Sequence, residues 1–179
     1  VLRHPVQGSA KDAASKAVKP IVNAGDGVGE HPTQALLDLF TIWDELGLEY
    51  CQSAQQLVVV LVGDLKHGRT VHSLSQALDR FNTKLYFISP ESLAMPEYVT
   101  DELTGEWSTH QNLENILSEL DVLYVTRIQK ERFPDEEEYN KVAGIYKLTA
   151  GDLGNAKSGM IVMHPLPRVN ELDSGVDST

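Results

Sequence analysis

Two polar side chains stand three residues apart at the start of a predicted helix, a spacing suited to binding a small anion. His31 and Gln34 follow a glycine-rich turn, and Pro32 between them is typical of the first helical residue. Side chains three apart lie on one side of a helix. The first turn also presents free N–H groups and the positive end of the helix dipole. The stretch therefore fits a polar, negatively charged small molecule, and it fits a capped surface helix equally well.

Positively charged and neutral hydrogen-bond donors follow the ends of several predicted strands. In chain order these are Arg3 and His4; Asn23, His31 and Gln34; Lys66, His67 and Arg69; Arg127, Gln129, Lys130 and Arg132; and His164 and Arg168. A guanidinium group binds carboxylate or phosphate oxygens two at a time. A single arginine is more often part of a surface ion pair. Three arginines at corresponding strand ends instead favour a site for a ligand with several negative groups.

The stretch His164-Pro165-Leu166-Pro167 is unusual because its two prolines fix the backbone and remove two N–H donors. The loop is then rich in carbonyl acceptors, which suits recognition of an NH₂ group. A cis bond between Leu166 and Pro167 would aim those carbonyls. An ordinary rigid loop is the alternative interpretation.

The elements that must position these residues alternate along the chain. Strands are predicted at 1–5, 20–24, 57–62, 84–89, 106–109, 121–125 and 160–163, and helices at 8–18, 31–46, 71–81, 96–103, 112–119 and 131–142. The unbroken apolar run 57–62 is typical of a parallel strand buried on both faces. The alternation predicts an α/β fold with a parallel sheet flanked by helices, whose ligands bind beyond the carboxyl ends of the strands.

Helical spacing also predicts the buried face of the long helix 31–46. Leu36, Leu39, Phe40 and Trp43 recur at intervals of three and four residues. We expect these four side chains to form the buried face of this helix. The acidic run 135–138 is interpreted as the solvated face of another helix.

Composition bounds the class of protein. With 179 residues and 41% hydrophobic residues, the chain predicts one globular domain, or one domain and part of another. A net charge of −11 argues against a nucleic-acid or membrane partner. No apolar run reaches membrane-spanning length, and the start does not resemble a signal peptide. The single cysteine, Cys51, excludes an intrachain disulfide, and a cytoplasmic location is expected.

Other chemistries are disfavoured by what the motifs lack. The stretch after the 57–62 strand, Gly63 to Gly68, has no second glycine of a dinucleotide fingerprint, and Leu65 would obstruct a pyrophosphate. No P-loop or covalent-nucleophile motif occurs. His67 and His72 lie five apart with no third ligand nearby, so we expect no metal and no cofactor. A nucleotide-binding α/β module is thus a weaker alternative.

Four motifs together resemble the aspartate carbamoyltransferases. They are HPTQ at 31–34, GDLKHGRTVHS at 63–73, TRIQKERF at 126–133 and HPLPR at 164–168. The resemblance covers nearly the whole chain and implies a Rossmann-like fold truncated at both ends. It implies transfer of the carbamoyl group of carbamoyl phosphate to L-aspartate, which gives N-carbamoyl-L-aspartate and phosphate in pyrimidine synthesis. Motif details look closer to the eukaryotic enzymes, where this domain can be fused into a larger pathway protein.

The resemblance also implies which residues bind carbamoyl phosphate. Arg3 would hold its phosphate and carbonyl oxygen, and His31 would hydrogen-bond that same oxygen, so both are expected to be catalytic. Gln34 would bind the amino group. The backbone carbonyls of Pro165 and Leu166 would take the same NH₂.

The aspartate side of the site follows by the same resemblance. Arg69, Arg127 and Gln129 would clamp the aspartate carboxylates, and an arginine at 69 suits a carboxylate better than the ammonium group of ornithine. Residues 1–28 would be the last part of the carbamoyl-phosphate-binding domain. Residues 29–179 would be the interdomain helix and an incomplete aspartate-binding domain.

The same family pattern implies partners beyond the two substrates. A full-length chain is expected to form a homotrimer whose sites are shared between subunits. The chain starts at Val1 without an initiator methionine and ends without a terminal element, so we expect a fragment that is inactive alone. Transfer to another amine such as ornithine, or a non-catalytic substrate-binding or assembly domain of a larger protein, are the alternatives.

Overall fold

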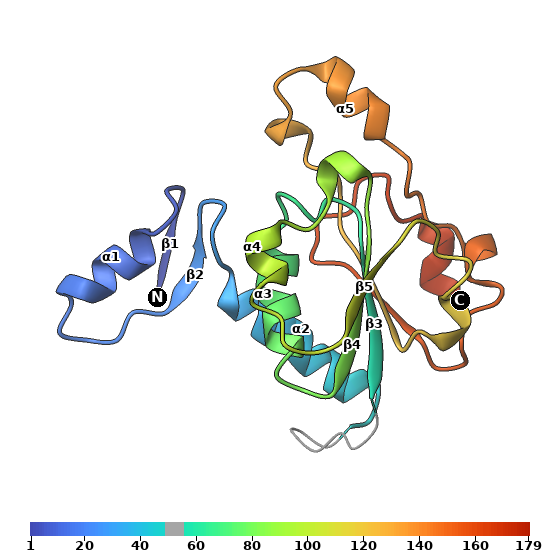
Figure 1. The fold of residues 1–179 in the computed structure, drawn as a ribbon, viewed down its shortest axis with the longest axis horizontal. Helices are drawn as coiled ribbons and strands as arrows, with labels where there is room; N and C mark the ends of the chain where they lie inside the picture. The colour runs from blue at the N-terminus through green and yellow to red at the C-terminus, as the bar shows by residue number, and fades with distance from the viewer. Residues whose placement is uncertain (49–55) are drawn as a thin grey trace.

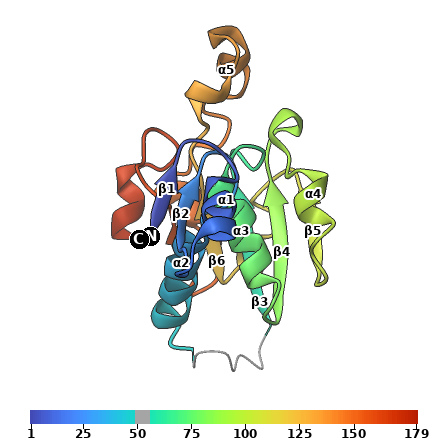
Figure 2. The same cartoon turned by 90° about the vertical axis from the view of Figure 1, so that its left-hand side faces the viewer.

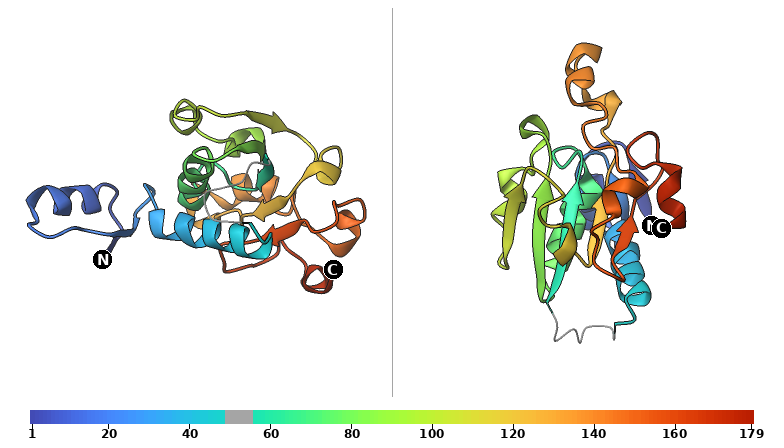
Figure 3. Two further views of the ribbon diagram at one scale, coloured as in Figure 1. Left: turned by 90° about the horizontal axis from the view of Figure 1, so that it is seen from below. Right: turned by 90° about the vertical axis from the view of Figure 1, so that its right-hand side faces the viewer.

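A computed structural model describes residues 1–48 and 56–179 of the chain, so Cys51 lies outside the described residues. A small N-terminal unit comprises β1 (Leu2–His4), α1 (Ser9–Lys16) and β2 (Asn23–Asp26), with β1 and β2 paired in parallel. Helix α2 (Pro32–Glu45) leads from this unit to a larger sheet. The unit projects from one end of the molecule (Figure 1 and the left view of Figure 3).

The larger sheet has five parallel strands in the order β5-β4-β3-β6-β7 (Figure 3, right). These strands are β3 (Leu57–Val62), β4 (Thr83–Ile88), β5 (Trp107–His110), β6 (Val122–Val125) and β7 (Ile161–Met163). The remaining α-helices are α3 (Arg69–Leu78), α4 (Glu97–Thr100) and α5 (Glu136–Val142). The predicted parallel α/β fold is confirmed. The chain runs outward from β3 to β5 and then returns to β6, so the carboxyl ends of β3 and β6 form a switch point.

Strand β3 is buried on both faces, as its unbroken apolar run predicts. Val59 and Leu61 belong to a core cluster that includes residues of α2 and α3. Val60 and Val62 belong to a second cluster, which is closed by 3₁₀ turns and loops. Figure 2 views the molecule from the N-terminal unit and, with Figure 1, shows α2 and α3 between that unit and the sheet. Among the described residues, no helix combines the length and apolar character needed to cross a membrane.

The buried face of α2 matches the predicted one only in part. Trp43 is buried and Leu39 packs against the core, as predicted, whereas Leu36 is 66% exposed and Phe40 is 53% exposed. Ala35, Asp38 and Ile42 are buried as well. Apolar residues occur on both sides of this helix, so their spacing does not single out one face. The side that faces the sheet carries a buried carboxylate, Asp38, which Tyr124 of β6 satisfies with a hydrogen bond.

Several element bounds also differ from the prediction. The expected helix at 112–119 is only a 3₁₀ turn at Leu117–Glu119, because the chain must enter β6 at Val122. The charged helix begins at Glu136 instead of 131, because Pro134 favours extended backbone before it and Asp135 caps the helix. The strand predicted at 20–24 is β2 at Asn23–Asp26, so part of the expected glycine turn is strand.

Candidate active site

The carboxyl ends of β1, β3, β6 and β7 meet the starts of α2 and α3 around a pocket of about 740 Å³. A pocket of this size suits a small-molecule ligand. All eight predicted site residues line it, namely Arg3, His31, Gln34, Arg69, Arg127, Gln129, Pro165 and Leu166. The structure thus brings together residues that are far apart in the sequence. Which ligand group each residue binds stays a prediction.

The pocket is strongly positive although the whole chain carries a net charge of −11. Four arginines line it, Arg3, Arg69, Arg127 and Arg132, and its described lining includes no acidic side chain. Burial lowers the pKa of Arg69, and the nearby charges of Arg3 and Arg132 lower it further. Arg69 Nη1 donates to the carbonyl oxygen of Gly27 at 2.6 Å, which fixes the guanidinium group across the pocket. A ligand with several negative groups would relieve the repulsion among these arginines.

His31 occupies the N-cap position of α2, where its backbone N–H donates to Ser73 Oγ at 3.0 Å. Burial lowers the pKa of the imidazole, and the charges of Arg69 and Arg3 lower it further. The ring is therefore neutral at pH 7. Thr33 Oγ1 lies 3.3 Å from Nδ1, and when this hydroxyl donates, the ring proton sits on Nε2. His31 can then donate one hydrogen bond to a ligand oxygen.

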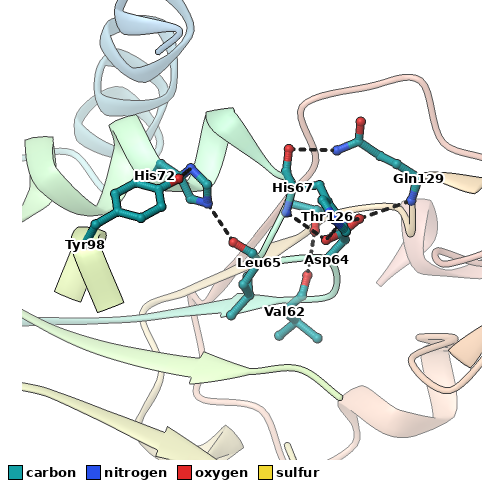
Figure 4. A network of polar contacts seen from close by, with 8 residues as sticks. All are labelled: Val62, Asp64, Leu65, His67, His72, Tyr98, Thr126 and Gln129. Carbon is teal, nitrogen blue, oxygen red and sulfur yellow. Dashed lines mark hydrogen bonds and ion pairs between the residues drawn. The ribbon is translucent and has the colours of Figure 1, made fainter. Parts of the chain in front are cut away.

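A buried carboxylate ties together the loops that follow β3 and β6 (Figure 4). Asp64, fully buried, accepts hydrogen bonds from the backbone N–H of His67 at 3.0 Å and of Gln129 at 3.4 Å. Its Oδ1 also lies 3.1 Å from the His67 Nδ1 atom. The Gln129 side-chain amide donates to the His67 carbonyl at 3.2 Å. Asp64 therefore sets where His67 and Gln129 enter the pocket.

The loop after β7 closes the last side of the pocket. The Leu166–Pro167 peptide bond is cis, which is one of the two arrangements that the sequence left open, and Leu166 adopts a φ of +55°. The backbone N–H of Leu166 donates to His164 Nδ1 at 2.9 Å, so the neutral ring presents Nε2 to Glu171 at 2.9 Å. Burial lowers the pKa of His164, although Glu171 opposes that shift. No sequence pattern indicated that Leu166 would adopt a left-handed backbone conformation.

Five further polar side chains line the pocket without having been assigned a role in binding: His4, His67, Thr70, Arg132 and His164. The sequence already indicates all but Thr70 as donors at strand ends. Each lies beside or within a motif that the sequence already singled out. His4 follows Arg3, for example, and Thr70 follows Arg69. Position relative to a strand end was thus a usable signal for them. By contrast, the ties made by Asp64 depend on contacts that no spacing rule predicts.

Comparisons with known proteins agree with this architecture. The family described as aspartate/ornithine carbamoyltransferase, Asp/Orn binding domain, matches residues 55–179, and the carbamoyl-P binding domain of the same family matches residues 1–44. An aspartate carbamoyltransferase catalytic subunit of Archaeoglobus fulgidus is 54% identical over the whole chain. A multifunctional protein pyr1-3 of Dictyostelium discoideum is 52% identical over 99% of the chain, which corresponds to 8% of that protein.

Solved structures give the same result. An aspartate transcarbamoylase of Trypanosoma cruzi, in complex with carbamoyl phosphate and aspartate, is 43% identical with a TM-score of 0.87, over 98% of this chain and 58% of that chain. The catalytic subunit of M. jannaschii aspartate transcarbamoylase is 47% identical with a TM-score of 0.83, over 98% and 56%. The chain spans 58% of the length of the Archaeoglobus relative. On the evidence of both matched domains, this chain belongs to the aspartate/ornithine carbamoyltransferase family.

Proposed function

We propose that the chain carries most of the substrate-binding residues of an aspartate carbamoyltransferase. The enzyme would transfer the carbamoyl group of carbamoyl phosphate to the amine of L-aspartate. The observation that carries this proposal is the pocket itself, in which four arginines converge with His31 and Gln34 and no acidic side chain is among the described lining. Such a site fits two polyanionic substrates held side by side. The names of the Archaeoglobus and Trypanosoma relatives support aspartate as the acceptor.

Carbamoyl phosphate would bind at the side of the pocket formed by β1 and the start of α2. Arg3 would contact its phosphate and carbonyl oxygens, and neutral His31 would donate to the carbonyl oxygen from Nε2. Gln34, with the backbone carbonyls of Pro165 and Leu166, would accept the hydrogens of its NH₂ group. These contacts would place the carbamoyl carbon with its oxygen facing two donors.

Aspartate would bind at the switch point between β3 and β6. Arg69 and Arg127 would hold its two carboxylates, and Gln129 would add a hydrogen bond beside them. Ornithine carries a side-chain ammonium group, which the charge of Arg69 and its neighbours would repel. The electrostatics therefore favour aspartate over ornithine as the acceptor.

The reaction needs no covalent enzyme intermediate. The neutral amine of aspartate attacks the carbamoyl carbon, a C–N bond forms, and the C–O bond to phosphate breaks. Negative charge develops on the carbamoyl oxygen, where a well-placed donor such as Arg3 or His31 stabilises the transition state by about 3–4 kcal/mol. The departing phosphate accepts the proton that the amine loses. Holding both substrates in line contributes further rate, on the order of 7–11 kcal/mol at best.

We also infer the organisation of the longer protein. Residues 1–28 would end the carbamoyl-phosphate-binding domain, and residues 29–179 would form the interdomain helix and most of the aspartate-binding domain. The full-length enzyme would act in the cytoplasm as a homotrimer whose subunits share sites.

The test is the formation of N-carbamoyl-L-aspartate from carbamoyl phosphate. We would compare this chain with an extended chain, in which the segments of the Archaeoglobus relative that have no counterpart in this sequence are added at both ends. We expect product only from the extended chain and only with aspartate, with ornithine as the control acceptor. A folded extended chain that binds carbamoyl phosphate and aspartate yet forms no product would instead support a non-catalytic binding domain.

A further inference from the structure

We propose that Asp38 and Tyr124 are positioning residues, which orient Gln34 so that its side-chain carbonyl oxygen faces the pocket. Gln34 Nε2 donates to Asp38 Oδ1 at 2.9 Å, and the Tyr124 hydroxyl donates to Asp38 Oδ2 at 2.8 Å. Asp38 is 4% exposed and Tyr124 is fully buried. The carboxylate thus lies beneath Gln34 and outside the pocket lining, where it cannot contact the ligand itself.

The direction of the glutamine amide follows from the chemistry of its partner. An ionised carboxylate only accepts hydrogen bonds, so the Gln34 group that faces Asp38 must be its NH₂. The Gln34 carbonyl oxygen is then left for a ligand. Burial raises the pKa of Asp38 above its usual value, and the hydrogen bonds from Gln34 and Tyr124, which favour the charged form, offset that shift only in part.

Tyr124 is itself held in place. The ring of Tyr124 is fully buried in β6, and its hydroxyl donates to Asp38. The series from Tyr124 through Asp38 to Gln34 joins β6 and α2 beneath the pocket. Because every member has a partner, the orientation of Gln34 is fixed before a ligand arrives.

This inference rests on the proposed function for the identity of the ligand. A carbonyl oxygen at Gln34 recognises an NH₂ group and gains nothing from a methyl group of the same size. Carbamoyl phosphate and acetyl phosphate differ in that one group. The ratio of their dissociation constants includes the Pro165 and Leu166 carbonyls as well as Gln34, while contacts to the phosphate cancel. A change in this ratio on substitution of Asp38 therefore reports the orientation of Gln34.

The test is the substitution Asp38→Asn in the extended chain. Tyr124 would still donate to the oxygen of the new amide, so the NH₂ of that amide would face Gln34 and turn the glutamine side chain over. Gln34 would then present a donor to the donor NH₂ of carbamoyl phosphate. We expect the preference for carbamoyl phosphate over acetyl phosphate to fall at least about tenfold, with acetyl phosphate binding unchanged. Asp44→Asn, which alters an exposed carboxylate of the same helix, should keep the preference of the unaltered chain.

A preference that survives Asp38→Asn in a folded protein would overturn the inference. If Asp38→Asn does not fold, Tyr124→Phe keeps the ring and the carboxylate but removes the anchor, and we expect it to lower the preference about threefold. Equal weakening of carbamoyl phosphate binding and acetyl phosphate binding would also contradict the inference, because a general disturbance of the pocket would have the same effect.

A second measurement separates this inference from the proposed function. The side-chain NH₂ resonances of Gln34 in the ligand-free protein should shift in Asp38→Asn and stay unchanged in Asp44→Asn. If the unaltered extended chain binds neither phosphate, the proposed function fails, and the Gln34 resonances alone decide the orientation. Unchanged Gln34 resonances in Asp38→Asn would refute the inference that Asp38 orients Gln34.

Discussion

At the scale of single residues, the pocket keeps two of its lining histidines, His31 and His164, neutral. Burial lowers the pKa of both His31 and His164, and nearby arginine charges lower each further. A neutral imidazole donates at one nitrogen and accepts at the other without adding positive charge beside four arginines. Each ring can thus hold a fixed hydrogen-bond pattern at neutral pH.

A third histidine, His72, ties α3 to the loop after β3 and makes stability depend on pH. Its Nε2 lies 2.7 Å from the Leu65 carbonyl oxygen, and Tyr98 lies beside the other nitrogen (Figure 4). Burial lowers the pKa of His72 below its value in the unfolded chain. The stability that depends on the neutral ring is present above the unfolded pKa and is lost as pH falls through the folded pKa.

We therefore predict that His72→Gln reduces the loss of stability between pH 7 and pH 5. Glutamine keeps a donor toward Leu65 but does not titrate. The contribution removed is about 1.4 kcal/mol for each unit by which folding lowers the pKa. Urea unfolding at both pH values would measure it. His110→Gln is the control, because His110 is only partly buried. An equal change in the pH dependence of stability in both variants would contradict the prediction.

Asp64 gives a second prediction at this scale. Asp64→Asn removes the charge that accepts from the backbone of His67 and Gln129. We expect the extended chain to bind aspartate about tenfold more weakly, because Gln129 lies on the proposed aspartate side, while carbamoyl phosphate binding changes little. Calorimetric titration of each substrate would show the difference. Equal weakening of both would mean that Asp64 only supports the fold.

At the scale of elements, the ends of β3 and β6 approach more closely than side chains allow. A Cβ atom added to Gly63 would lie 2.3 Å from the Thr126 carbonyl oxygen, and Gly63 has a φ of +119°. We predict that Gly63→Ala destabilises the protein by at least about 3 kcal/mol, since it adds both strain and overlap. Gly47→Ala is the matched control. Gly47 has a φ of +62°, and no atom of the described residues 1–48 and 56–179 lies within 4 Å of the added Cβ atom, so about 1 kcal/mol is expected.

Chemical denaturation of the two glycine variants would test this directly. If both variants lost a similar amount of unfolding free energy, the backbone conformation at Gly63, and not the close approach of β3 to β6, would account for the destabilisation.

How far the sequence predicts these elements depends on whether one face of each is distinctive. The run Leu57–Val62 is apolar throughout, and its strand was predicted at the bounds that β3 has. Helix α2 has apolar residues on both sides, so spacing selected Leu39 and Trp43, which pack in the core, together with Leu36 and Phe40, which are exposed. The stretch 112–119 has helical spacing, but its turn ends where the entry into β6 requires. Local pattern thus predicts strands in the sheet better than short connections around it.

For the pocket, the sequence predicts the residues at strand ends but not those beneath them. Arg69 and Arg127 follow buried strands, so the rule for parallel sheets brings them together. Asp38 occupies a position in α2 where an apolar residue would be expected, and its hydrogen bonds with Gln34 and Tyr124 explain it. A buried carboxylate is stabilised by partners that lie far away in the sequence, and a single sequence does not reveal which residues these are.

At the scale of the whole molecule, the pocket joins two units of the fold. Arg3 belongs to β1 of the N-terminal unit. Arg69 begins α3, which packs on the larger sheet, and Arg127 follows β6 of that sheet. The charge of Arg3 is close enough to lower the pKa of Arg69. In the absence of a ligand, like charges from the two units therefore oppose each other across the pocket.

An anion with several charges should consequently stabilise the molecule as a whole. N-(phosphonacetyl)-L-aspartic acid, which is bound in one Trypanosoma cruzi structure, joins a phosphonate to two carboxylates. At 100 times its dissociation constant, a ligand that binds only the folded state adds about 2.7 kcal/mol. The extended chain has roughly 310 residues, because this chain spans 58% of the Archaeoglobus relative. For that size the gain corresponds to a rise in Tm of about 4 °C. We predict such a rise for the extended chain, and a much smaller one for acetate at equal ionic strength.

Arg3→Ala distinguishes a ligand that bridges the units from one that binds the larger sheet alone. If the anion contacts both, this variant should lose most of the rise in Tm, although Arg69 and Arg127 are intact. Arg80→Ala, which removes an exposed arginine outside the pocket, should keep it. A full rise in Arg3→Ala would show that the N-terminal unit does not take part in binding. In the expected case, the repulsion between the units in the empty pocket becomes attraction to one ligand, so binding and the relative placement of the two units are coupled.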